Sequence, residues 1–290
     1  MAEHKKDIDE FSGVETTGHE WDGLKELNNP LPRWWIMTFY VCIIWAIGYW
    51  IAMPSWPLIE SYTAGVLGAS QRAQAIEAYE TAAAARAEKG AGLVEASLED
   101  IQGKQDLLEF AMANGKAAFG DNCAPCHGTG ATGSAGFPNL NDDDWLWGGS
   151  LEAIHTTIQY GIRSGHDEAR VGDMTAFGHD EILEKDQITQ VVGYVRSLSG
   201  MEAEGADIEA GKTVFVDNCA ACHGEDAKGM QELGAPNLTD GIWLYGSDAA
   251  TLTETVTAGR KGVMPAWTGR LDDVTIKSLA VYVHSLGGGQ

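Results

Sequence analysis

The chain has 290 residues and a mass of 31.0 kDa, enough for about two domains of ordinary size. It carries 19 Lys and Arg against 42 Asp and Glu, a formal charge of -23. Nucleic acid and anionic membrane surfaces repel an acidic protein, so neither is expected as the main partner, and a basic protein partner is favoured. Four of the five cysteines lie in two C-x-x-C-H pentads, which argues against a disulfide framework.

Residues 34–57 are predicted to be the transmembrane segment, which consists of a single helix. The 20 residues from Trp34 to Met53 include no Asp, Glu, Lys or Arg, and as a helix they span about 30 Å, enough to cross a bilayer core. Trp34 and Trp35 stand at one end, and Tyr49, Trp50 and Trp56 stand at the other, where such rings prefer the headgroup level. A buried soluble helix and a cleaved signal peptide are the alternatives. The signal peptide is disfavoured because 33 mixed, mostly acidic residues precede the run.

The basic residues near this helix predict its orientation. Four precede it, namely Lys5, Lys6, Lys25 and Arg33. Within about 20 residues after it, only Arg72 follows. Residues 1–33 are therefore expected to be a cytoplasmic N-terminal segment.

The rest of the chain consists of a linker and a repeat. Residues 58–105 are rich in Ala and Glu and are predicted to be a helical linker, a spacer without core residues. Beyond it the sequence repeats: segment 115–123 returns as 211–219, and the Pro-Asn-Leu motif at 138–140 returns at 236–238. Two copies of one domain are therefore expected after the linker.

Residues 106–200 are predicted to be the first copy and residues 206–290 the second, each with three helices. The first helix of each copy ends at the pentad, and the last helix carries apolar residues three and four positions apart, as a buried stripe requires. The middle helix is expected to run from an N-cap to a terminating glycine: Ser150 to Gly161 in the first copy and Asp248 to Gly259 in the second. The last helix is expected to start near Asp186 or Asp272. The expected fold class is all-α.

Both pentads have the spacing of covalent haem c attachment: Cys123, Cys126 and His127 in the first copy, and Cys219, Cys222 and His223 in the second. Two thiols three positions apart can reach the two vinyl groups on one edge of a porphyrin, and the next imidazole can then bind the iron. A thioredoxin-like redox pair does not need the adjacent His, and a zinc site needs a closed shell of four ligands. Two covalently bound haem c groups are therefore predicted.

A sixth iron ligand is expected beyond the middle helix, and each copy offers one methionine, Met174 in the first and Met264 in the second. A His and Met pair raises the potential of haem iron and fills both axial positions, which indicates electron transfer and not oxygen or peroxide chemistry. Met264 is followed by Pro, whereas Met174 follows an insert and lacks that Pro. His166 and His179 therefore remain alternatives to Met174.

Taken together, the anchor, the linker and the two pentads resemble the dihaem subunit III of cbb3-type cytochrome c oxidase. The most specific likeness is the segment from Thr17 to Trp35, which is similar to that family's signature before the membrane helix. Residues 161–166 are similar to the family's usual insert. The resemblance implies one transmembrane helix followed by two tandem class I cytochrome c domains. It also implies the bacterial inner membrane as location, with the haem domains in the periplasm.

In that family the subunit accepts electrons from a soluble cytochrome c or another donor and passes them through a monohaem subunit to the catalytic subunit, which reduces oxygen to water in a proton-translocating complex. The resemblance thus implies these subunits and membrane lipid as partners, and no catalytic residue in this chain. The charge of the chain further predicts a basic face on a soluble cytochrome c donor. The alternatives are a membrane-anchored dihaem shuttle or dehydrogenase subunit, and a dihaem peroxidase, which would need one five-coordinate haem.

Overall fold

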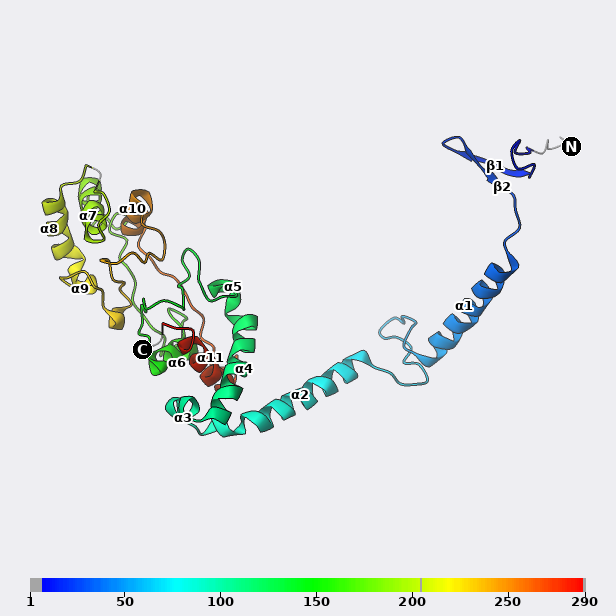
Figure 1. Cartoon of the computed structure of the whole chain (residues 1–290), viewed down its shortest axis with the longest axis horizontal. Helices are drawn as coiled ribbons and strands as arrows, with labels where there is room; N and C mark the ends of the chain where they lie inside the picture. The colour runs from blue at the N-terminus through cyan, green and yellow to red at the C-terminus, as the bar shows by residue number, and fades with distance from the viewer. Residues whose placement is uncertain (1–6, 204, 289–290) are drawn as a thin grey trace. The chain divides into compact units, whose positions relative to one another are not determined.

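The computed structural model describes residues 7–203 and 205–288. The chain forms two compact units, Met1–Ala83 and Ala84–Gln290. Lys5 and Lys6, which contribute to the predicted membrane orientation, lie outside the described residues. The elements in chain order (Figure 1) are β1 Thr16–Trp21, β2 Leu24–Leu27, α1 Arg33–Ala52, α2 Gln71–Val94, α3 Leu98–Gly103, α4 Gln105–Asn122, α5 Ala124–His127, α6 Leu151–Tyr160, α7 Lys185–Leu198, α8 Ile208–Asn218, α9 Ala220–His223, the 3-10 helix Gln231–Leu233, α10 Ala249–Ala258 and α11 Asp273–His284.

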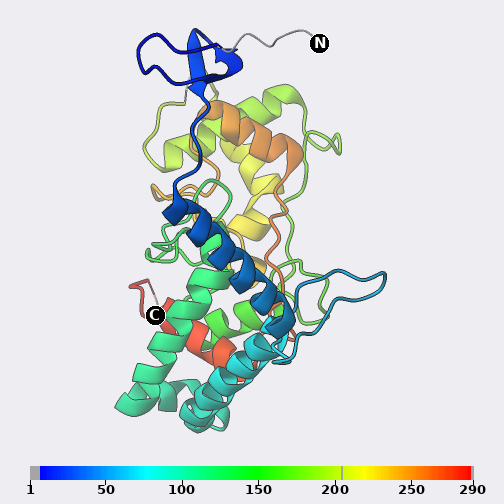
Figure 2. The ribbon, with the colours of Figure 1, turned by 90° about the vertical axis from the view of Figure 1, so that its right-hand side faces the viewer.

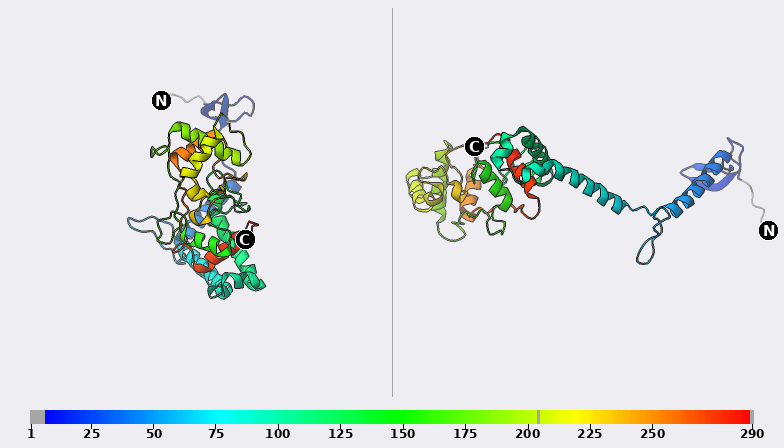
Figure 3. Two further views of the ribbon diagram at one scale, coloured as in Figure 1. Left: turned by 90° about the vertical axis from the view of Figure 1, so that its left-hand side faces the viewer. Right: turned by 90° about the horizontal axis from the view of Figure 1, so that it is seen from below.

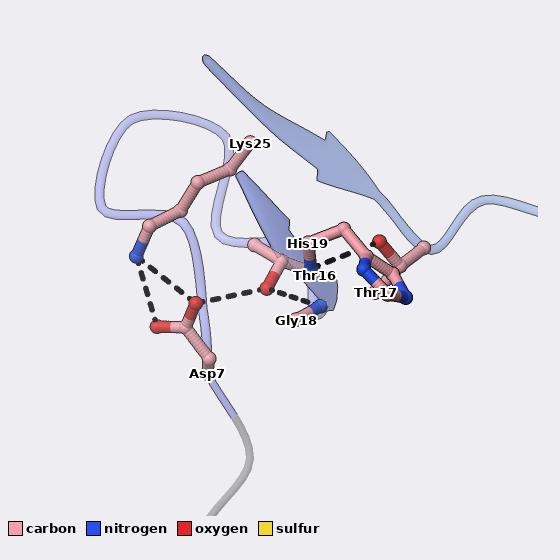
Figure 4. A network of polar contacts seen from close by, with 6 residues as sticks. All are labelled: Asp7, Thr16, Thr17, Gly18, His19 and Lys25. Atoms are coloured by element: carbon pink, nitrogen blue, oxygen red, sulfur yellow. Dashed lines mark hydrogen bonds and ion pairs between the residues drawn. The ribbon is translucent and has the colours of Figure 1, made fainter. Parts of the chain in front are cut away.

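An antiparallel hairpin, β1 with β2, precedes the membrane helix, and the sequence analysis did not predict it. Its turn is Asp22-Gly23, and both residues have positive φ, as the tight turns of two-residue hairpins require. The carboxylate of Asp7 accepts hydrogen bonds from the Lys25 ammonium at 3.0 Å and the Thr16 hydroxyl at 2.9 Å (Figure 4). These bonds lower the pKa of Asp7 and connect the segment before the hairpin to both strands.

Helix α1 is long and apolar enough to cross a membrane, and it is the only such helix in the described residues. A loop folds back on its last turn. The last four carbonyls of α1, residues 49–52, accept hydrogen bonds from the N–H groups of Met53, Val66 and Leu67 and from the hydroxyl of Ser55. A helix end normally leaves these carbonyls without partners, and in a bilayer each would cost several kcal/mol. The loop after α1 therefore provides hydrogen-bond donors for all four of these carbonyls.

The helices of the unit Ala84–Gln290 form two groups. Helix α11 packs against α4 and α6, and Figures 1 and 2 show the red α11 lying against the green α4. Helix α7 packs against α8 and α10, and this second group, yellow-green to orange, lies together in both views of Figure 3. Because α11 belongs to the second sequence copy and α7 to the first, the two copies have exchanged their last helices.

Each group has its own apolar core. The first core is built on α4, α6 and α11 and includes Phe119, Leu151, Ile154, Ile158, Ile276, Leu279 and Val283. The second core is built on α7, α8 and α10 and includes Ile188, Val191, Val192, Val214, Phe215 and Leu252. The predicted apolar stripes of the last helices are thus confirmed as buried, but each stripe faces the helices of the other copy.

The end of the linker belongs to the first core, so the expectation of a spacer without core residues is wrong. Leu93 in α2 and Ile101 in α3 are fully buried there. The ammonium of Lys277 in α11 donates to the carbonyls of Leu93 at 3.1 Å and of Val94 and Ala96 at 2.9 Å. A cation at a helix C-terminus is favourable because it satisfies orphan carbonyls and complements the helix dipole.

The predicted helix boundaries agree with the structure. Ser150 and Asp248 cap the N-termini of α6 and α10 through their side chains, and Gly161 and Gly259 end these helices with positive φ. Helices α4 and α8 end directly before Cys123 and Cys219, as the repeat predicted.

Candidate haem sites

Each pentad forms one helical turn directly after a long helix. In the first, the N–H groups of Cys126 and His127 both donate to the carbonyl of Cys123, at 3.1 and 2.9 Å, and the second repeats the pattern at Cys219 with the same distances. Side chains at positions i, i+3 and i+4 of such a turn share one face. The two thiols and the imidazole of a pentad are therefore presented together.

The imidazole of each pentad is held by a backbone carbonyl. Nδ1 of His127 lies 3.1 Å from the carbonyl oxygen of Pro138, and Nδ1 of His223 lies 3.1 Å from that of Pro236. A carbonyl can only accept, so Nδ1 carries the proton and Nε2 keeps its lone pair for a metal. Burial lowers the pKa of both imidazoles, which favours the neutral, ligating form.

The thiols fit a porphyrin better than the alternatives. Burial raises the pKa of Cys123 and of Cys219 to about 11 each, whereas a thioredoxin-like pair depends on a lowered thiol pKa. Cys126 and Cys222 are exposed, and none of the four pentad cysteines forms a disulfide. Within residues 7–203 and 205–288, no three or more His, Cys, Asp or Glu side chains gather as a metal-ion site would require. The donor set therefore suits a porphyrin held by two thioethers and one imidazole.

The methionine beside the first pentad comes from the second copy. Met264 and Ile162 exchange two backbone hydrogen bonds of 3.0 and 2.9 Å, directly after the end of α6. Met264 packs against the first core, as Cys123 does. A Cβ at Gly161 would lie 2.4 Å from the carbonyl oxygen of Met264, so only glycine permits this approach.

The second site mirrors the first. The N–H of Met174 donates to the carbonyl of Arg260 at 3.2 Å, directly after α10, and a Cβ at Gly259 would lie 2.3 Å from the carbonyl oxygen of Met174. Phe177, three residues later, packs against the second core together with Cys219. Sequence order pairs Met174 with the first pentad, but the packing puts it with the second.

Comparison with known proteins identifies an N-terminal domain and two cytochrome c domains in this chain. Residues 13–60 match the family model of the N-terminal domain of cytochrome oxidase-cbb3, FixP; residues 112–199 match cytochrome c; and residues 206–283 match cytochrome c oxidase, cbb3-type, subunit III. Over the full length of both chains, the sequence is 60% identical to the cbb3-type cytochrome c oxidase subunit FixP of Bradyrhizobium sp. (strain ORS 278) and 55% identical to the subunit CcoP of Azospirillum brasilense. It is 54% identical to the subunit CcoP of Cereibacter sphaeroides over 95% of each chain.

The chain belongs to the cbb3-type cytochrome c oxidase subunit III family. The predicted family and fold class, a mostly helical chain with one N-terminal apolar helix and two cytochrome c domains, are thereby confirmed. The family also decides between the functional alternatives, in favour of the oxidase subunit and against an unrelated shuttle, dehydrogenase subunit or peroxidase.

The two histidine alternatives to Met174 lie in unsuitable surroundings. Nδ1 of His166 accepts the N–H of Glu168 at 3.0 Å, so its proton must sit on Nε2 and neither nitrogen offers a free lone pair. Its ring also packs against that of Tyr160, with the ring centroids 4.8 Å apart and the planes inclined by 32°. His179 is exposed to solvent. Met174 is therefore the better candidate in this subunit.

Sequence reasoning missed the role of the Pro-Asn-Leu motifs. They were recognised as landmarks of the repeat, but their proline carbonyls orient the two imidazoles. Their recurrence at nearly the same distance from each pentad was the available signal. Any residue has a backbone carbonyl, so the type of residue does not show which carbonyl will accept a hydrogen bond. The sequence alone therefore did not identify the two proline carbonyls as partners of the imidazoles.

Proposed function

We propose that this subunit III relays electrons through two haem c groups, attached through Cys123 and Cys126 and through Cys219 and Cys222. His127 and Met264 would bind the iron of the first group, and His223 and Met174 that of the second. Bound haem c supplies a one-electron iron couple. The chain supplies the ligands, their orientation and the apolar surroundings.

The observation that carries this proposal is the shared environment of each imidazole and its methionine. His127 is oriented by Pro138, and Met264 packs against the same core as Cys123. If His127 with Met264 and His223 with Met174 hold the two irons, the chain's own side chains would keep oxygen and peroxide from binding there. This arrangement supports an electron relay, while oxygen reduction belongs to the catalytic subunit of the oxidase.

The charge of the haem-bearing part supports a basic donor. From Gly115 to the C-terminus the chain carries 11 Lys and Arg against 25 Asp and Glu, a formal charge of -14. Burial and the negative charges of Asp240 and Asp142 raise the pKa of Asp144, so acidic residues of both copies contribute to one negative field. Such a field steers a basic protein toward this surface. The donor is therefore proposed to be a soluble cytochrome c with a basic face, and the monohaem and catalytic subunits to be the next partners.

The topology is proposed to be a single pass of α1 through the bacterial inner membrane, with the N-terminus in the cytoplasm and both haem domains in the periplasm. Lys25 and Arg33 on the N-terminal side of α1 support this orientation. Protease added to spheroplasts should remove the haem domains. Cleavage only after lysis would refute the orientation.

The haem content is tested on the full-length chain purified in detergent. A haemochrome assay should give two haem c groups per chain, and Cys219→Ala with Cys222→Ala should halve that number. Carbon monoxide should leave the reduced spectrum unchanged, because both axial positions are filled. Stoichiometric carbon monoxide binding, or one haem in the unaltered chain, would contradict the relay.

A further inference from the structure

Two arginines occupy equivalent places in the two halves of the haem-bearing unit. The guanidinium of Arg260 lies over the ring of Tyr245, with Cζ 4.1 Å from the ring centroid, and its Nε and Nη2 donate to the hydroxyl of Thr255 at 2.9 and 2.6 Å. Thr255 lies on α10, so the arginine is fixed against the middle helix of its copy.

Arg170 makes the corresponding contacts in the other half. Its Cζ lies 5.8 Å from the centroid of the Trp147 ring, its Nε donates to the hydroxyl of Thr157 at 3.4 Å, and its Nη2 donates to the carbonyl of Ala153 at 3.4 Å. Trp147 and Tyr245 are equivalent in the repeat, as are Thr157 and Thr255.

The two arginines reach these places from different sequence positions. Arg260 follows Gly259, which ends α10, whereas Arg170 lies within an insert, residues 164–171, that the second copy lacks. The insert returns to the end of α6, where the N–H of Arg170 donates to the carbonyl of Gly161 at 3.0 Å. Both copies thus place a guanidinium at the same point of the fold, although their local sequences differ.

The backbone of each arginine lies beside the segment of a proposed axial methionine. The carbonyl of Arg260 accepts the N–H of Met174, and Arg170 is bonded to Gly161, next to the Ile162 that pairs with Met264. Arg260 is therefore placed beside the second haem site and Arg170 beside the first.

Both arginines are half-buried cations without an acidic partner. In the part of the chain that the structure describes, neither guanidinium forms an ion pair with an Asp or Glu, although Arg163 and Lys261 lie 4.0 and 3.6 Å from the carboxylate of Asp173. Burial lowers the pKa of Arg170, which reports the cost of withdrawing its charge from water. A partly buried charge is normally paired, and a planar guanidinium matches a carboxylate with two parallel hydrogen bonds.

We propose that Arg170 and Arg260 each bind a propionate carboxylate of the haem in their own half: Arg170 at the haem on Cys123 and Cys126, and Arg260 at the haem on Cys219 and Cys222. This inference rests on the proposed haem attachment and adds two cofactor-binding residues to it. Each bound haem would carry two propionate carboxylates, which could supply the acidic partner that each arginine lacks. In both halves the arginine lies beside an aromatic ring and keeps N–H donors for such a carboxylate.

The positive charge of each arginine would also raise the potential of its haem. A nearby cation favours the reduced iron, which carries one positive charge less than the oxidised iron. Replacing the arginine by a neutral side chain should therefore lower the potential of one haem, whereas Lys should keep most of the charge and lose the two-pronged hydrogen bonding.

The test uses the full-length chain in detergent with Arg170→Gln, Arg260→Gln and the double variant. Arg170→Lys and Arg260→Lys serve as charge-conserving variants. Arg163→Gln is the matched control, because Arg163 donates to the carbonyl of Gly262 at 2.6 Å and lies near Asp173. Three quantities are measured: haem c per chain, the reduction titration, and the propionate bending bands in the resonance Raman spectrum, which respond to hydrogen bonds on the carboxylates.

Each Gln variant should keep two haems and shift one half of the titration to lower potential, and the double variant should shift both halves. Each should also move the propionate bands, whereas Arg163→Gln should move neither signal. The Lys variants should keep the potential near the unaltered value but still move the bands. Unchanged bands in the Lys variants and in any haem-loaded Gln variant would overturn the proposal and leave the arginines as helix-fixing residues. Loss of haem from the unaltered chain would instead refute the haem attachment itself.

Discussion

The ring of Phe119 lies 5.6 Å from the ring of Tyr282, and the two planes are inclined by 57°. Phe119 lies in the last turn of α4, the first helix of one copy, and Tyr282 lies in α11, the last helix of the other. The equivalent pair, Phe215 with Tyr194, has a centroid distance of 5.4 Å and an angle of 56°. The same contact between a first and a last helix thus occurs twice, and in each case the two helices come from different copies. The position of each pentad therefore depends on a helix from the other copy.

This helix contact predicts a steric effect at Gly115 in α4. A Cβ there would lie 2.2 Å from the carbonyl oxygen of Ser278 and 2.7 Å from the Cβ of Tyr282. Gly115→Ala should therefore force α4 and α11 apart and lower the free energy of unfolding by about 1–3 kcal/mol. Urea unfolding of the full-length protein, followed by haem absorbance, measures this loss.

The matched control is Gly120→Ala in the same helix, where an added Cβ would meet nothing within 4 Å. That variant should be neutral or more stable by up to about 1 kcal/mol, because Ala is the better helix former. Equal destabilisation by both substitutions would contradict the close helix contact at Gly115.

The exchanged methionines predict which haem each substitution affects. Met264→His and Met174→His should each keep a low-spin haem but lower its potential, because a second imidazole stabilises ferric iron better than a thioether does. Each variant should lose part of the absorption band of Met-ligated ferric haem, and the double variant should lose it completely.

Which methionine binds which haem is tested in a chain that also carries Cys219→Ala and Cys222→Ala. Only the first haem can attach to that chain. There, Met264→His should abolish the remaining band and Met174→His should leave it intact. The opposite result would show that each copy uses its own methionine. Full retention of the band in Met174→His of the two-haem chain would point to His166 or His179.

The charge of the haem-bearing part predicts a salt-dependent reaction with the donor. The bimolecular rate of haem reduction by a basic cytochrome c should fall steeply between about 10 and 200 mM salt, because electrostatic steering is screened over about 10 Å at 0.1 M. Stopped-flow measurements give this rate, with an uncharged small reductant as control. A rate that is flat or rises with salt would indicate an apolar docking surface or a membrane-bound donor.

The raised pKa of Asp144 predicts that the folded protein loses stability as the pH rises. Burial and the carboxylates of Asp240 and Asp142 raise the pKa of Asp144 to about 6, well above its unfolded value of about 3.9. The unfolded chain therefore releases this proton first, and the folded state loses stability as pH rises from about 4 to 6. Because Asp144 is only partly buried, Asp144→Asn should stabilise the protein at pH 7 by only about 1 kcal/mol.

Below about pH 4 that gain should vanish, since the carboxyl is then protonated in both states. Thermal unfolding of the full-length protein at both pH values measures the difference. The exposed neighbour Asp143 provides the control, and Asp143→Asn should change little at either pH. A gain for Asp144→Asn that persists at pH 4 would have another origin than this carboxyl.

The sequence predicted the helices and their ends correctly, but it did not predict which helices pack against one another. Ser150 and Asp248 as caps, Gly161 and Gly259 as helix ends, and the pentads are local features, and the structure agrees with them. The exchange is not local. An apolar stripe on a last helix fits either copy's first helix, because Gly115 and Gly211 offer the same close approach.

Other features were hidden for different reasons. Leu93 and Ile101 lie in a segment of helix-forming composition, and the break between α2 and α3 divides the apolar residues there, so no single periodic stripe marked them as core. Arg170 is displaced by the insert and does not align with Arg260 when the repeat is read at a constant shift. The hairpin had a readable signal, the Asp22-Gly23 turn, but its strands are short and mostly polar.

The packing of α11 against α4 determines the order in which the protein can be completed during synthesis. A nascent chain that ends near residue 200 contains the first pentad and α6, but neither Met264 nor the helix that fills the first core. The first pocket therefore closes only after the last helix has been made, although its pentad is synthesised before the other one. Until then Cys123 and Cys126 lie in an open chain, where both thiols are accessible for attachment. The C-terminus thus governs the maturation of the site nearest the membrane anchor in sequence.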